Sequence, residues 1–133
     1  MTTAESIATA LRSHADGSYC LAAAAELLIA QAWLDRADFT SRFITLHRSP
    51  SSGTPVAVVD WPAAITALGT SLRCSGGEQR MLKITASLAD GIPVDLRDAI
   101  TGLDPRNVHL VTAAIQHAAS GSGFRGKKPS DTP

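Results

Sequence analysis

Apolar residues recur at intervals of three and four along most of the chain, which is the spacing of amphipathic helices. The segment from residue 19 to residue 34 is apolar around most of its circumference, so we expect it at the centre of a helical bundle. In the last helical segment, the predicted buried face consists of Val108, Val111, Ile115 and Ala118. The helices predicted from this spacing cover residues 4–13, 19–34, 60–68, 75–89 and 104–119, with a short helix at 95–100 and a short helical turn at 38–43.

The spacing changes to an alternation of two between residues 43 and 59. Ile44 and Leu46 alternate with Thr45 and His47, and a second alternating run covers residues 55–59. Ser, Pro, Gly and Thr lie between the two runs and favour a turn. The pattern predicts a β-hairpin, which must pack on the helices because two strands alone are marginally stable in water.

Residues that cap helices stand at most of the predicted boundaries. Asp60 precedes a proline in the first turn of its helix, Ser75 and Glu78 have the spacing of a capping box, and Gly91 follows a helix end. The sequence therefore predicts a mainly α fold, a compact bundle of five or six helices with one β-hairpin, as a single domain over residues 1–119. Residues 120–133 are rich in Gly, Ser and Lys and are predicted to form a disordered basic tail.

The composition favours a core made of small aliphatic side chains. The chain has 133 residues, 22 of them alanine, and only 5% are aromatic. Such helices bury little area per residue, so we expect a protein partner or self-association to complete the core. Residues 1–120 carry nine Lys or Arg against eleven Asp or Glu, whereas nucleic-acid binders are usually basic.

The distribution of apolar residues also indicates the cellular compartment. The N-terminus lacks the basic flank and the apolar run of a signal peptide. The most apolar stretch, residues 20–34, contains Glu26 and Gln31 and is too short to span a bilayer. We therefore expect a cytoplasmic protein without a membrane partner, in which Cys20 and Cys74 are reduced.

The segment from Cys74 to Arg80 resembles the signature motif of ABC-type ATPases, and Thr101 to Asn107 resembles their D-loop. In that family the motif places a helix N-terminus against a phosphate, so Ser75, Gly76 and Gly77 form a candidate anion site. The chain has no phosphate-binding P-loop, and Arg97 stands where the resemblance requires the Walker B aspartate. We interpret the two motifs as a capping box and a proline-started helix, and we do not expect an ATPase.

A second candidate site consists of basic residues around the hairpin. Arg36, Arg42, His47 and Arg48 accompany a short helix and two strands, an order similar to a winged-helix DNA-binding element around residues 36–59. Arginine side chains bind guanine edges and phosphates through paired hydrogen bonds. Asp35 and Asp38 partly cancel this charge.

No catalytic or metal-binding pattern stands out. His109 and His117 are two helical turns apart and cannot hold one ion without a third element. The sequence therefore predicts no enzyme, no cofactor and no metal. A small-molecule sensor, with a pocket lined by Leu28, Trp33 and Trp61, is a third class of function that the pattern leaves open.

Over residues 19–119 the chain resembles a family of small uncharacterised helical proteins from high-GC actinobacteria. The stretches that carry this resemblance are mainly core and capping positions, and it implies no activity. They are residues 25–29, 33–34, 60–61, 75–78, 93–99 and 102–104. The leading interpretation is a non-catalytic protein–protein interaction or accessory protein, and the alternative is a DNA-binding protein.

Overall fold

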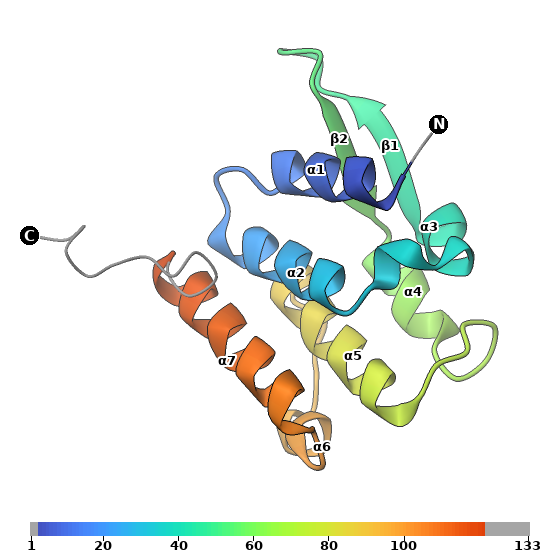
Figure 1. Cartoon of the computed structure of the whole chain (residues 1–133), viewed down its shortest axis with the longest axis vertical. Coiled ribbons are helices and arrows are strands. Elements are labelled where there is room, and N and C mark those ends of the chain that lie inside the picture. The colour runs from blue at the N-terminus through green and yellow to red at the C-terminus, as the bar shows by residue number, and fades with distance from the viewer. Residues whose placement is uncertain (1–2, 122–133) are drawn as a thin grey trace, which may run out of the picture.

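The computed structural model describes residues 3–121, which form seven α-helices, one 3₁₀ turn and one antiparallel β-hairpin (Figure 1). This confirms the mainly α fold with one hairpin, and the helix count exceeds the predicted five or six because the short helical turns are true α-helices. No helix in this range is long and apolar enough to cross a membrane. The elements are α1 (Ala4–His14), α2 (Tyr19–Ala30), η1 (Trp33–Asp35), α3 (Ala37–Phe43), β1 (Ile44–Arg48), β2 (Pro55–Val59), α4 (Trp61–Ala67), α5 (Gly76–Asp90), α6 (Leu96–Ile100) and α7 (Pro105–Ser120).

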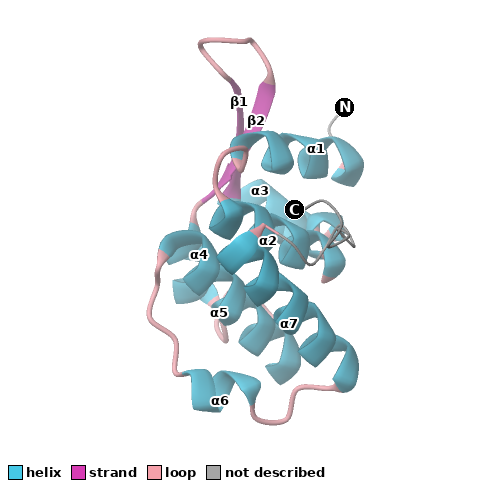
Figure 2. Cartoon of the chain, turned by 90° about the vertical axis from the view of Figure 1, so that its left-hand side faces the viewer, coloured by secondary structure: helices cyan, strands magenta, loops and turns pink. Residues whose placement is uncertain are grey.

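Helix α2 lies at the centre of the molecule, as its apolar circumference predicts, and contacts α1, α5 and α7. It joins two groups of buried side chains. Ala25 and Leu28 belong to the hairpin cluster, which also contains side chains of α1, α3, β2 and α4. Ala23 and Leu27 belong to the α7 cluster, which contains side chains of α5, α6 and α7. Figure 2 shows the hairpin and α6 at opposite ends of the molecule.

The second helix ends at Ala30 and not at residue 34 as predicted. Ala32 has a φ of 61°, a left-handed conformation that stops the helix and turns the chain into η1. The turn places Trp33 in the core, 2% exposed, with its ring centroid 5.1 Å from that of Phe39. Burial of the indole therefore accompanies the break that the periodicity did not predict.

Most predicted caps are confirmed. The Asp60 side chain accepts a hydrogen bond from the backbone N–H of Ala63 at 3.2 Å. The backbone N–H of Glu78 donates to Ser75 Oγ at 3.1 Å, and the Glu78 carboxylate accepts from the backbone N–H of Ser75 at 2.7 Å. The helix predicted from residue 38 begins one residue earlier: α3 begins after Arg36, with no side-chain cap, and Asp38 does not cap it but lies in its first turn.

The hairpin runs from Ile44, paired with Val59, to Arg48, paired with Pro55, which confirms the predicted position within one residue. Strand β2 packs against α1, and its Ala57 and Val59 are buried. Strand β1 is far more open, and Leu46 is 44% exposed. Because β1 follows α3 directly, Phe43 belongs to the helix and points into the core.

The predicted buried face of the last helix is only half right, since Val111 is buried and Ala118 is partly buried against the same cluster. Val108 and Ile115 are 48% and 52% exposed, whereas Ala114 and His117 are buried together with Val111. At 3.6 residues per turn, the buried face is rotated by roughly a quarter of a turn from the predicted one. The small Ala114 side chain allows the close packing of α7 on α2.

Two hydrogen bonds hold α7 in this orientation. Gln31 Nε2 donates to Asn107 Oδ1 at 2.7 Å, and Arg106 Nη2 donates to the backbone oxygen of Ala30 at 3.0 Å. Both bonds join the first turn of α7 to the end of α2. They fix the rotation of α7 about its axis, which apolar periodicity alone left open.

Helix α7 includes Ser120 and is capped by Gly121, whose φ is 78°. A Cβ atom at position 121 would lie 2.6 Å from Tyr19 Cζ, so the backbone approaches the start of α2 closely here. Of the predicted tail, residues 122–133 lie outside the described residues.

Candidate functional site

Arg36, the first of the basic residues predicted to contact DNA, is bound within the protein. Its Nη2 donates to Asp38 Oδ2 at 2.8 Å and to the backbone oxygen of Arg73 at 2.6 Å. Its guanidinium also lies 4.8 Å from the centroid of the Trp33 ring. The side-chain hydrogen bond with Arg36 lowers the pKa of Asp38. Arg36 therefore joins the turn before α3 to the loop between α4 and α5.

Of the other three candidates, Arg42 makes a contact within the fold, whereas His47 and Arg48 lie on the hairpin. Arg42 Nη2 donates to Ser71 Oγ at 2.7 Å, and its guanidinium lies 4.6 Å from the Phe43 ring centroid. Arg48 Nη1 donates to the backbone oxygen of Gly53 at 2.7 Å within the hairpin. His47 is exposed on β1. Arg36 and Arg42 thus both bind to the same loop, residues 68–75. No sequence motif predicts this association.

The candidate anion site at Ser75, Gly76 and Gly77 opens α5. The Glu78 carboxylate accepts a hydrogen bond from the backbone N–H of Ser75, so a negatively charged group of the chain itself already lies at the start of the helix. Burial raises the pKa of the neighbouring Cys74 thiol, and the Glu78 charge adds to the rise. These contacts agree with the interpretation of this segment as a capping box.

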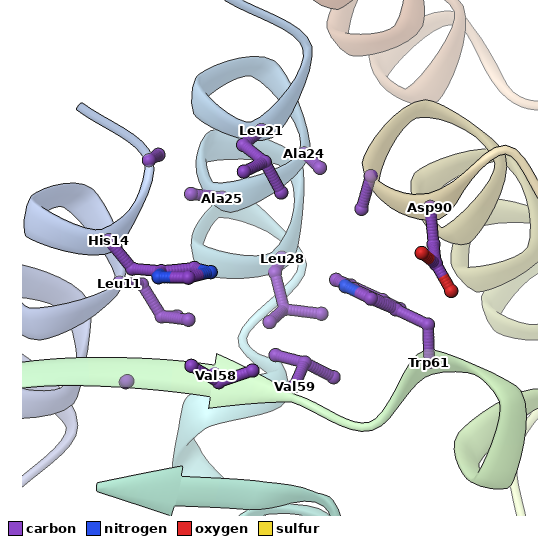
Figure 3. A pocket seen from close by; sticks show the side chains of 13 residues that line it. Leu11, His14, Leu21, Ala24, Ala25, Leu28, Val58, Val59, Trp61 and Asp90 are labelled. Carbon is purple, nitrogen blue, oxygen red and sulfur yellow. The ribbon is translucent and has the colours of Figure 1, made fainter. Parts of the chain in front are cut away.

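An apolar pocket of about 230 Å³ lies between α1, α2, β2, α4 and the end of α5 (Figure 3). Leu28 and Trp61 line it, as predicted for a small-molecule site, but Trp33 does not, because it is buried against Phe39. His14 and Asp90 are its titratable lining residues, and Figure 3 shows the His14 ring directed inward between α1 and α2.

One face of α7 is apolar and is not covered by any of the residues that the structure describes. Val108, Thr112, Ile115 and Ala119 follow one another at intervals of four, three and four, and all four are exposed. We name this set the α7 stripe. No Asp, Glu, Lys or Arg occurs between Asn107 and Ser120. Periodicity located only Val108 and Ile115 and assigned both to the buried face, so their exposure is what identifies the stripe.

The titratable groups in the described part of the chain do not gather into a metal site, since no three His, Cys, Asp or Glu side chains there are placed to hold an ion. The pKa of Arg12 is raised by its hydrogen bond with Glu26, where Arg12 Nε donates to Glu26 Oε2 at 2.7 Å. This ion pair joins α1 to α2. Cys20 and Cys74 are free thiols, the first of them exposed.

The geometry thus offers a pocket, a basic hairpin region and an apolar stripe. No protein-family model, curated protein or solved structure matches this chain. The resemblance to small actinobacterial proteins stays a prediction, and the function is argued from the geometry alone.

Proposed function

We propose that this chain is a non-catalytic protein–protein interaction or accessory protein and that the α7 stripe is its interaction surface. One observation carries the proposal: Val108 and Ile115 are 48% and 52% exposed on the same face of a helix. Exposed apolar patches with a polar border are typical of protein interaction sites. His109 and Gln116, both exposed, form the polar border on one side.

The packing and hydrogen bonding that hold α7 on α2 also favour this role. Its opposite face is buried on α2, and the bonds of Arg106 and Asn107 to α2 fix its rotation. A surface held rigidly in this way loses little conformational entropy when a partner binds. Burial of the stripe contributes about 25 cal/mol for each Å² of apolar area removed from water.

Site-specific photo-crosslinking in living cells tests the proposal. A photoreactive phenylalanine derivative replaces Thr112, in the middle of the stripe, and the matched control carries it at His109 on the polar side. We expect a covalent adduct with a protein from position 112 and none from position 109. The Ile115→Lys substitution should remove the adduct, because it introduces a charge into the contact. No protein adduct from position 112 would refute the proposed function.

DNA binding through residues 36–59 is the alternative proposal. It is favoured by the projection of the hairpin beyond α1, which exposes His47 (Figure 1). It is weakened because the guanidinium groups of Arg36, Arg42 and Arg48 are bound to other parts of the chain.

A titration of duplex DNA at increasing salt concentration tests the alternative. Binding through phosphate contacts should weaken with a log–log slope of about one unit for each contact. The Arg42→Ala/Arg48→Ala variant should bind more weakly, whereas Arg80→Ala/Arg97→Ala, which removes the same charge outside the hairpin region, should not. No binding at low salt would eliminate this alternative.

The proposed interaction protein would act in the cytoplasm and without a cofactor. The free thiols of Cys20 and Cys74 support a reducing compartment, because disulfides are rare there. Fractionation of the source cells, with detection of the chain in each fraction, tests this assignment.

A further inference from the structure

We propose that the occupant of the α7 stripe is a second copy of this chain, which binds as a two-fold symmetric dimer with the two α7 helices antiparallel. The inference rests on the proposed function, since it names the partner of the same surface. It follows from the order of residues in the stripe, from the absence of charge on it and from the position of α7 in the molecule.

The stripe is complementary to itself in the antiparallel orientation. Its intervals of four, three and four residues read the same in both directions. A two-fold axis between positions 113 and 114 therefore places Val108 opposite Ala119 of the second copy and Thr112 opposite Ile115 of the second copy. Each larger side chain meets a smaller one, which allows two helices to pack closely.

The electrostatics also favour a second copy. Two-fold symmetry brings identical surfaces together, so a charged side chain near the axis would lie close to the same side chain of the second copy and be repelled by it. Between Asn107 and Ser120 the helix carries no Asp, Glu, Lys or Arg, and the interface therefore contains no repulsion between such charges. Antiparallel helices in addition place the positive end of one helix dipole near the negative end of the other.

The position of α7 allows the contact. In Figure 1, α7 lies at one side of the helical layer, and no described element lies beyond it. The stripe is roughly 16 Å long at a rise of 1.5 Å per residue. An interface built on one helix is smaller than the standard area of about 1,600 Å², so the dimer should be weak and concentration-dependent.

Sedimentation equilibrium over a range of concentrations tests the association. We expect the weight-average mass to rise from that of one chain toward twice that value as the protein concentration increases, because association follows mass action. Ile115→Lys should weaken dimerisation by roughly ten-fold or more, because it places two like charges near the axis. His109→Lys, the matched control on the polar side of α7, should leave it nearly unchanged. A single-chain mass at every concentration would overturn the inference.

Cysteine crosslinking tests the orientation, in a background in which Cys20 and Cys74 are replaced by Ala. Two chains, one with Val108→Cys and one with Ala119→Cys, are mixed and mildly oxidised. We expect crosslinked dimers in the mixture, because positions 108 and 119 face one another across the axis. Val108→Cys alone should form few, because its two copies would lie roughly 16 Å apart along the helices, beyond disulfide reach. Efficient crosslinking of Val108→Cys alone would overturn the antiparallel arrangement.

The mass of the photo-adduct from position 112 separates the inference from the proposed function. An adduct with twice the mass of the chain, containing only its own peptides, supports the second copy. An adduct with a different protein, together with a single-chain mass in sedimentation, overturns the inference and leaves the proposed function standing. No adduct at all contradicts both.

Discussion

At the scale of single residues, the two thiols lie in different surroundings. Cys20 is exposed in the first turn of α2, whereas Cys74 is partly buried before α5 and lies near Glu78. Burial and the nearby carboxylate both disfavour the thiolate of Cys74, which raises its pKa. The thiolate is the reactive form of cysteine, so the two residues should differ in reactivity.

We predict that a thiol reagent at neutral pH modifies Cys20 first and Cys74 several-fold more slowly. Above neutral pH the rate at Cys74 should continue to rise toward its raised pKa, since the fraction of thiolate grows. Mass spectrometry of samples quenched over time measures both rates. In Cys20→Ala only the slow reaction should persist, and a fast reaction in that variant would contradict the assignment.

A second prediction concerns the capping box of α5. Ser75→Ala removes the acceptor for the Glu78 backbone N–H and should lower the free energy of unfolding by about 1 kcal/mol. Ser75→Gly should cost only a few tenths of a kcal/mol, because glycine is itself tolerated at this position. Urea denaturation followed by circular dichroism measures both variants. Ser41→Ala, on the exposed side of α3, is the control and should leave stability nearly unchanged.

At the scale of elements, the break after α2 depends on a strained residue. Ala32 is exposed and adopts a φ of 61°, where an L-amino acid with a Cβ atom is disfavoured. We predict that Ala32→Gly stabilises the protein by up to about 1 kcal/mol, because glycine adopts this conformation freely. Thermal denaturation measures the change. Ala37→Gly, at an exposed helical position, should destabilise, and a loss of stability in both variants would contradict the strain at Ala32.

The sequence predicts elements well where a local signal marks them. The boundaries at Asp60 and Ser75 are fixed by side chains that bond to nearby backbone groups, and the boundary at Gly91 by the left-handed backbone of the glycine, so three or four consecutive residues carry the information. The rotation of α7 depends on bonds between Arg106 or Asn107 and α2, which lies far away in the sequence. No local pattern contains these contacts, and the predicted buried face was wrong at Val108 and Ile115 for that reason.

At the candidate site, too, the sequence does not predict contacts between residues that are far apart along the chain. The sequence identified Arg42 and Arg36 but not their partners, because Ser71 and Arg73 lie 29 and 37 residues further along the chain. Two residues of the α7 stripe, Val108 and Ile115, were visible as apolar periodicity. Their exposure could not be predicted, since the amount of apolar surface that a neighbouring helix covers depends on the whole fold.

At the scale of the whole molecule, α2 connects the two clusters of the core. Leu27 and Leu28 are adjacent in sequence, yet one lies in the α7 cluster and the other in the hairpin cluster. Loss of α2 would therefore expose both clusters together. A domain of this size with a shared central helix should unfold in one cooperative transition.

Two matched substitutions test this cooperativity. Ile84→Val lies in the α7 cluster and Ile7→Val in the hairpin cluster, and both isoleucines are 6% exposed. Each should lower the free energy of unfolding by about 1 kcal/mol. Trp33 and Trp61 both belong to the hairpin cluster, so their fluorescence reports that cluster directly. Ile84→Val should shift the fluorescence and circular dichroism midpoints equally, and a shift in circular dichroism alone would show that the clusters unfold separately.

The close approach of Gly121 to Tyr19 couples two positions about a hundred residues apart in sequence. The left-handed backbone and the 2.6 Å approach to the Tyr19 ring both act against a side chain at 121. A side chain at position 121 would therefore require the exposed Tyr19 ring to move away, and the left-handed backbone makes asparagine the favoured replacement. Substitution at position 121 should be tolerated best in descendants of the sequence in which position 19 carries a smaller residue.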